Sequence, residues 1–102
     1  MGIQTARIGF SEHNIRIYAP DKSGVYCLYD QYGRIIYYGK ADQLTIKERL
    51  LAHFKGAVTA CTKSAITFNF EVTDKPSERE IQLLKEFQGA YRSLPRCNER
   101  IG

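Results

Sequence analysis

The stretch GVYCLYDQYGRIIYYG (24–39) most constrains the fold of this chain, because two strand-like runs flank a tight turn. Residues 24–30 and 34–39 are rich in β-branched and aromatic side chains, which favour β-strands. Between them, DQYG (30–33) is typical of a tight turn in which Gly33 takes the left-handed conformation. The stretch therefore predicts an antiparallel hairpin, although the turn alone does not fix its register.

The segment after the hairpin predicts a helix over residues 46–55. Thr45 has the character of an N-cap, and Glu48 lies three residues further on, as in a capping box. Three apolar residues recur at a spacing of four and form the expected buried stripe: Ile46, Leu50 and Phe54. Arg49 and His53 are also four residues apart, so they lie on one helix face that borders this stripe.

A further strand and a further helix follow. Residues 65–73 alternate apolar and polar side chains, which predicts a half-buried strand with four residues facing the core: Ile66, Phe68, Phe70 and Val72. After Pro76, SERE (77–80) is a second capping-box pattern and opens a helix of roughly three to four turns. Pro95 prevents the helix from continuing, so the tail 94–102 is expected to be irregular.

The order strand, strand, helix, strand, helix indicates an α/β (α+β) fold. We expect a small, mainly antiparallel, three-stranded sheet flanked by helices. The 102 residues, with 43% hydrophobic residues, fit one globular domain over residues 1–102. The first twenty residues are ambiguous, but the alternation in NIRIYAP (14–20) is compatible with a strand that ends at Pro20.

Composition narrows the possible functions only moderately. The net charge of +4 suits a polyanionic partner without requiring one. The three cysteines, Cys27, Cys61 and Cys97, are odd in number and lack a CxxC pair, which argues against structural zinc. Cys27 lies in a strand pattern and is interpreted as a small buried hydrophobe. We expect an intracellular, reducing setting, without a signal peptide or a membrane-spanning run.

The second helix contains one charged residue that does not fit its surroundings. Its apolar stripe consists of Leu83, Leu84, Phe87, Tyr91 and Leu94. Glu80 falls near the centre of this stripe, whereas Glu78 falls on the opposite side of the helix. A carboxylate in line with an apolar face is costly without a partner. Two explanations stay open: Glu80 closes the capping box at Ser77, or it holds a cation, either a metal ion or an arginine.

Together these residues resemble the GIY-YIG endonuclease family, including the nuclease domain of the bacterial excision-repair enzymes. Five elements appear in the family's order: Gly24-Val25-Tyr26 with Tyr37-Tyr38-Gly39, then Arg49, His53, Glu80 and Asn98. The histidine is similar to one carried by several restriction and homing members. The resemblance covers residues 24–98. Val25 and Tyr38 replace isoleucines of the pattern, and the gaps before Arg49 and before Asn98 are longer than in the repair enzymes.

The resemblance implies hydrolysis of DNA phosphodiester bonds with one divalent metal ion, Mg²⁺ or Mn²⁺, in each active site. Glu80 would be the metal ligand and Tyr26 the general base. A phenol titrates near pH ~10, so Tyr26 needs nearby positive charge, for which Lys40 and Arg49 are candidates. Arg49 would also hold the scissile phosphate. His53 would orient Tyr26 or accept its proton, and Tyr37 would position the substrate.

DNA is the expected partner, with no membrane association. The candidate DNA contacts are Lys40, Lys47, Lys55, Lys63 and Asn98. Two other classes of function stay open: a catalytically silent DNA-binding module of the same fold, and a protein-interaction domain anchored by the hairpin aromatics. Each residue also has an ordinary structural role available, such as ring packing for the tyrosines. The sequence does not distinguish a monomer from a transient dimer on DNA.

Overall fold

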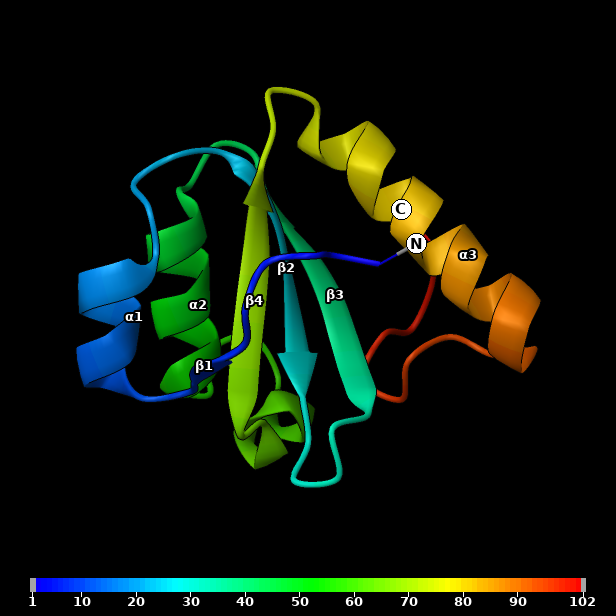
Figure 1. Ribbon diagram of the computed structural model, residues 1–102, viewed down its shortest axis with the longest axis horizontal. Helices are drawn as coiled ribbons and strands as arrows, with labels where there is room; N and C mark the ends of the chain where they lie inside the picture. Colours follow the sequence, from blue (N-terminus) through cyan, green and yellow to red (C-terminus); the bar gives the residue numbers. More distant parts are fainter. Residues whose placement is uncertain (1, 102) are drawn as a thin grey trace.

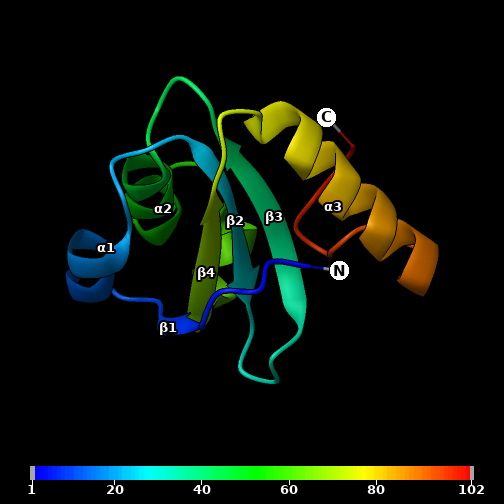
Figure 2. The same ribbon diagram turned by 45° about the horizontal axis from the view of Figure 1, so that its top comes forward.

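Helices cover both faces of a four-stranded antiparallel sheet in the computed structural model, which describes residues 2–101 (Figure 1). The strand order is β1-β4-β2-β3. Helices α1 and α2 lie on one side of the sheet and α3 on the other (Figures 1 and 2). Along the chain the elements are β1 (Ile8–Gly9), α1 (Glu12–Tyr18), β2 (Gly24–Tyr29), β3 (Ile35–Ala41), α2 (Ile46–Phe54), the 3₁₀ helix η1 (Ala60–Ser64), β4 (Thr67–Val72) and α3 (Pro76–Tyr91).

The predicted hairpin is confirmed. Strands β2 and β3 pair antiparallel, and Gly33 in the turn has φ of 77°, in the left-handed region. The register places Tyr26 opposite Gly39 and Leu28 opposite Tyr37. All six residues of β2 are buried, since it lies between β3 and β4 and both of its faces are covered. Tyr26 and Leu28 face α2, whereas Val25 and Cys27 belong to the core under α3.

The N-terminal segment differs from the prediction in two ways. The sheet has four strands instead of three, because the two-residue strand β1 adds to the edge of β4. The strand that the sequence allowed over residues 14–20 is not present, since α1 occupies most of that segment. The Ser11 hydroxyl caps this helix by accepting a hydrogen bond from the Asn14 backbone, and Ile15 is buried while Ile17 is 57% exposed. The alternation of isoleucines therefore does not reflect a buried sheet face.

Helix α2 has the predicted capping box but a different buried face. The Thr45 hydroxyl accepts from the Glu48 backbone N–H at 3.1 Å, and the Glu48 carboxylate accepts from the Thr45 N–H at 2.9 Å. Ile46 and Leu50 are buried as predicted, but Phe54 is 38% exposed and His53 is fully buried in its place. His53, which was predicted to lie beside the apolar stripe, is therefore part of the buried face of α2.

Strand β4 is buried on both faces along its middle. Phe68 is fully buried toward α2, and its neighbour Asn69 is buried on the opposite side. Asn69 binds the Tyr29 hydroxyl and the backbone carbonyls of the N-terminal segment. The predicted alternation holds for Phe68, but Ile66 and Val72 at the strand's ends are about half exposed, at 52% and 51%.

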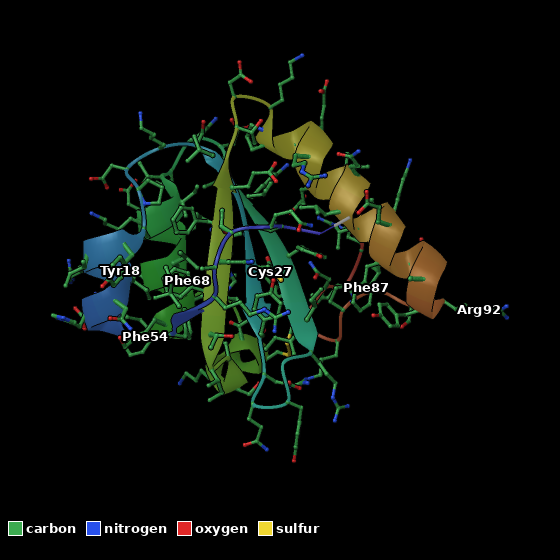
Figure 3. The ribbon with its side chains drawn as sticks, in the orientation of Figure 1. Tyr18, Cys27, Phe54, Phe68, Phe87 and Arg92 are labelled. Atoms are coloured by element: carbon green, nitrogen blue, oxygen red, sulfur yellow. A yellow bond between two sulfur atoms is a disulfide. The ribbon has the colours of Figure 1, made fainter. Side chains whose placement is uncertain are left out.

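The predicted capping box at the start of α3 is wrong. The helix begins at Pro76, with Lys75 as N-cap and no side-chain cap, so Ser77 is already the second helical residue. The Ser77 hydroxyl accepts a hydrogen bond from Lys40 Nζ at 3.1 Å. Leu83 and Leu84 are buried as predicted, and Figure 3 shows Phe87 pointing from α3 toward the sheet. Glu80 therefore does not close the helix end.

The tail after α3 runs along the free edge of β3 and is held by a disulfide. The Cys97 backbone N–H donates to the Ile36 carbonyl at 2.9 Å. Cys97 is bonded to Cys61 of η1, 36 residues earlier, a pair that no sequence pattern predicted. The bond does not fit the expected reducing setting, in which both thiols would be free. Closing a loop of that length disfavours the unfolded chain by about 4 kcal/mol. Cys27 is a free, buried thiol, as predicted. None of the described helices is long and apolar enough to cross a membrane.

Candidate active site

Side chains from β2, β3, α2 and α3 converge where α2 and the start of α3 approach β3. The tyrosines Tyr26 and Tyr37 stand on the sheet face that α2 covers, because they lie in diagonal positions of the hairpin register. His53 packs against both rings, with centroid distances of 5.4 Å to Tyr26 and 4.8 Å to Tyr37. Glu80 reaches the same place from α3 and shares a cavity of about 380 Å³ with Tyr37 and Arg49.

A chain of buried hydrogen bonds links Tyr26 to the 3₁₀ helix. The Tyr26 hydroxyl lies 2.8 Å from His53 Nε2, and His53 Nδ1 lies 3.0 Å from the Thr62 hydroxyl. The Thr62 hydroxyl donates to the Thr59 carbonyl at 3.2 Å. A hydroxyl has one proton to donate, so Thr62 must accept from Nδ1–H of His53. Nε2 is then the free acceptor, and Tyr26 donates its proton to it.

The protonation states fit this assignment. Burial, and secondarily the charge of Arg49, lower the pKa of His53 to about 4, so the ring is neutral near pH ~7. Burial, with a smaller contribution from Tyr37, raises the pKa of Tyr26 well above its ordinary value, while Arg49 works in the opposite direction. The free protein therefore holds a neutral phenol hydrogen-bonded to a neutral imidazole.

Gly39 makes room for the Tyr26 ring. A Cβ at position 39 would come within 2.3 Å of Tyr26 Cζ and 2.4 Å of its hydroxyl oxygen. Because Tyr26 is fully buried and directly opposite Gly39 in the register, the ring has no space to move aside. The glycine of the YYG element is thus required by the close approach of the tyrosine on the neighbouring strand.

Arg49 supplies positive charge to the site, as does Lys40, which lines the same cavity. Its guanidinium interacts with the phenols of both Tyr26 and Tyr37, and these interactions outweigh burial and raise its pKa. Its Nε is buried and has no hydrogen-bond partner among the described residues. A buried charged donor that lacks a partner costs free energy. The guanidinium is thus incompletely satisfied beside an open cavity, which is an arrangement suited to an anion.

Glu80 is the acidic group of the site. It is 8% exposed, and burial raises the pKa of its carboxyl, while Lys40 and Arg49 oppose that rise. Besides the cavity that it shares with Arg49, Glu80 lines one of about 290 Å³ with Thr59 and Asn98. Among the described residues no cluster of three or more His, Cys, Asp and Glu side chains forms a metal cage. A single carboxylate beside cavities of this size suits Mg²⁺, which keeps several of its waters in proteins.

The candidate DNA contacts lie at different places on the molecule. Lys40 lines the cavity of Glu80 and Arg49. Lys47 forms an ion pair with Asp21 at 3.5 Å, and Lys55 is exposed just after the end of α2; Lys63 is exposed on η1. Asn98 lines the cavity beside Glu80, but both ends of its amide bind β3, since Oδ1 accepts from the Tyr38 N–H and Nδ2 donates to the Tyr38 carbonyl, each at 2.9 Å.

The state of His53 makes the stability of the protein depend on pH. The unfolded histidine has the ordinary pKa of 6.5, but in the folded protein its pKa is about 4. The unfolded state therefore binds the proton first, and we expect the free energy of unfolding to fall by about 3 kcal/mol between pH 6.5 and 4. The neighbours facing the ring are Tyr26, Tyr37, Arg49 and Thr62.

Urea unfolding at several pH values tests this prediction, with His53→Gln against the exposed His13→Gln as the matched control. Acidification should destabilise the wild type and the control more steeply than His53→Gln. The comparison between variants is needed because the raised pKa of Glu80 contributes with the opposite sign. Equal pH slopes for all three proteins would show that His53 is not held neutral by the fold.

Comparisons with known proteins agree with this arrangement. The chain is 37% identical over 87 residues to the UvrABC system protein C of Lacticaseibacillus casei, and 34% identical over 89 residues to that of Clostridium perfringens. Each match covers 78% of this chain but only 14% of the relative, so the chain spans about one seventh of their length. No protein-family model matches the chain.

Solved structures show the same fold. The magnesium-bound GIY-YIG N-terminal endonuclease domain of UvrC from Thermotoga maritima matches 85% of this chain and 93% of its own, with a TM-score of 0.59 and 24% identity. A tyrosine-to-phenylalanine variant of that domain, bound to its catalytic divalent cation, matches with a TM-score of 0.57 and 26% identity. The chain has the fold of a GIY-YIG domain, and its sequence and structure resemble those of the GIY-YIG endonuclease family. Within that family, the chain is similar to UvrC, and the solved structures that it matches are of the N-terminal GIY-YIG domain of UvrC.

Proposed function

We propose that the chain, as a single domain over residues 1–102, is a metal-dependent endonuclease that hydrolyses phosphodiester bonds of intracellular DNA. The observation that carries the proposal is that Arg49 and Glu80 line one cavity, while the buried Tyr26 interacts with Arg49 and is hydrogen-bonded to His53. The UvrC relatives support the same activity class, since their matched structures are of an endonuclease domain.

Glu80 is the residue that would hold a divalent cation, Mg²⁺ or Mn²⁺, one for each site. A cation there would stabilise negative charge on the phosphate and on the leaving oxygen. Several features of this chain fit such a cation: one buried carboxylate, a raised pKa caused by burial, and two adjoining cavities able to hold the coordinating waters. The UvrC domain crystallised with magnesium is consistent with this choice.

The proton path runs through Tyr26. As a water oxygen attacks phosphorus, its proton passes to the Tyr26 oxygen while the phenolic proton moves to His53 Nε2. The P–O bond to the leaving oxygen breaks, the leaving oxygen takes up a proton from solvent, and His53 later releases its own proton to solvent. Thr62 fixes the tautomer that leaves Nε2 open. A phosphate bound to Arg49 would offset the charge that helps keep the pKa of His53 low, so His53 accepts a proton more readily with substrate in place.

Arg49 and Tyr37 would position the phosphate. The guanidinium presents a planar set of donors, and it is anchored by interactions with the two tyrosines. Lys40 would add charge at the cavity's edge, and Lys47, Lys55 and Lys63 would meet more distant phosphates. Asn98 is better suited to hold the edge of β3 than to bind DNA, because Tyr38 occupies both ends of its amide.

The test is nicking of supercoiled plasmid by the purified chain. We expect conversion to the open-circular form with Mg²⁺ and none with EDTA. Mn²⁺ is included as an alternative cation, and branched and damaged duplexes extend the substrates. If the folded protein binds these DNAs but cuts none of them with either cation, the proposal is wrong and the chain is a DNA-binding module. Failure to bind DNA at all would instead favour a protein-interaction domain.

A further inference from the structure

A groove at the hairpin-turn end of the molecule is not used by the proposed active site. It has a volume of about 510 Å³ and lies between the turn, the C-terminal half of α3 and the start of the tail. Its apolar wall includes Phe87, Tyr91 and Leu94. Figure 3 shows Phe87 between α3 and the sheet, and Arg92 at the far end of the same helix. No acidic side chain is among the described residues that line this groove.

Three arginines line the groove, and two of them are held by aromatic rings. The Arg7 guanidinium lies 3.7 Å above the Tyr29 ring and donates to the Gly33 carbonyl. Arg34 lies 4.9 Å from the centre of the Tyr32 ring, and its side chain is 71% exposed. Stacking on an aromatic face fixes a guanidinium while leaving its edge donors available.

Arg96, the third, donates to Asp30 Oδ2 at 3.0 Å and to the Ser64 hydroxyl. Asp30 also lies 4.0 Å from Arg34, and it is the one carboxylate that the described ion pairs place against these guanidiniums. Three positive charges against one negative charge leave an excess of two. The groove is therefore a cationic surface with an apolar wall, built from parts of the chain that are far apart in sequence.

The groove is connected to the proposed active site along two stretches of chain. Ile35 lines the groove, whereas Tyr37 and Lys40 of the same strand line the site. At roughly 3.3 Å per residue, these positions are about 7–17 Å apart. In the tail, Arg96 lines the groove and Asn98 lines the cavity beside Glu80. Since DNA rises about 3.4 Å for each base pair, this separation along β3 equals the rise of about two to five base pairs.

We propose that this arginine groove binds the sugar-phosphate backbone of the substrate DNA beside the cleaved bond. The inference rests on the proposed function for the identity of the polyanion. Fixed guanidiniums facing solvent are the usual partners of DNA phosphates, and such contacts position a duplex without reading its sequence. The groove thereby sets how the DNA lies across the site, and removing its charges weakens binding for all sequences alike.

The experiment measures binding apart from cleavage. Anisotropy of a labelled duplex of mixed sequence is recorded in EDTA at several KCl concentrations for the wild type, Arg34→Gln, and Arg34→Gln with Arg7→Gln. Each lost phosphate contact should lower the slope of log K against log salt by about 0.9, so we expect slopes reduced by about one and about two. Arg34→Lys keeps the charge and should keep the slope. Arg16→Gln, on α1 across the sheet, is the matched control.

Unchanged salt slopes in Arg34→Gln and in the double variant would overturn the proposal, as would an equal loss of slope in Arg16→Gln. Because Arg34 is exposed, its replacement leaves the core intact, and melting curves verify this. Plasmid nicking by the wild type with Mg²⁺ is a separate readout. If the wild type nicks DNA but the arginine variants keep the wild-type slope of log K against log salt, the proposal for the groove is wrong and the proposed nuclease activity stands. If the wild type cuts no DNA but the arginine variants lose slope as expected, the proposed nuclease activity is wrong and the proposal for the groove stands.

Discussion

Replacing Glu80 by glutamine is expected to lower the rate of DNA cleavage by at least about 10³-fold while leaving the protein folded. The Glu80 carboxylate is buried and lines both cavities of the site, whereas the other acidic side chains that line them, Glu99 and Asp42, are exposed. A metal ion contributes several kcal/mol to stabilising the charge of the transition state, and each ~1.36 kcal/mol is about tenfold in rate. Glutamine has nearly the same shape but no charge to hold the cation.

The matched control is Glu78→Gln, two residues earlier in α3 and exposed to solvent. Single-turnover cleavage should be unchanged in the control. The melting temperature of Glu80→Gln should equal or exceed that of the wild type, because the substitution removes a charge that is costly to bury. Cleavage by Glu80→Gln at the wild-type rate would exclude Glu80 as the metal ligand. The buried position of Glu80 near Lys40 and Arg49 would then have only a structural role.

The sequence predicted those parts of the fold that local patterns determine. The hairpin turn at Gly33 and the capping box of Thr45 and Glu48 each depend on residues within a few positions of one another, and both are present in the structure. The N-terminal segment stayed ambiguous, and a strand was possible there, because α1 is only seven residues long, too short for its period to outweigh two alternating isoleucines.

The sequence indicated candidate site residues at positions where a single residue did not fit its local pattern. Glu80 stood out as a carboxylate on an apolar stripe, but its partner depended on where α3 begins, which Pro76 decides. Thr62 was missed because an isolated threonine carries no signal until η1 folds against α2. The bond between Cys61 and Cys97 was missed for the same reason, since it joins segments that are distant in sequence.

The hydroxyl of Tyr26 gives the second large prediction. Tyr26→Phe is expected to lower the cleavage rate by about 10²–10⁴-fold, the usual contribution of a positioned proton-transfer group. The ring and its packing survive, so the KM for DNA should change little and the loss should appear in kcat. The substitution also leaves His53 Nε2 buried without its partner, which costs about 1–3 kcal/mol in the free energy of unfolding.

Tyr29→Phe separates this catalytic loss from the cost in stability. Tyr29 lies on the same strand, is also buried, and also donates a hydrogen bond to a buried acceptor, Asn69 Oδ1 at 3.0 Å, but it faces α3 instead of α2. Both variants should lose a similar free energy of unfolding, whereas only Tyr26→Phe should lose cleavage. If the two variants cut DNA equally well, the proton does not pass through Tyr26. If both lose cleavage equally, the loss reports on the stability of β2 and not on chemistry at its surface.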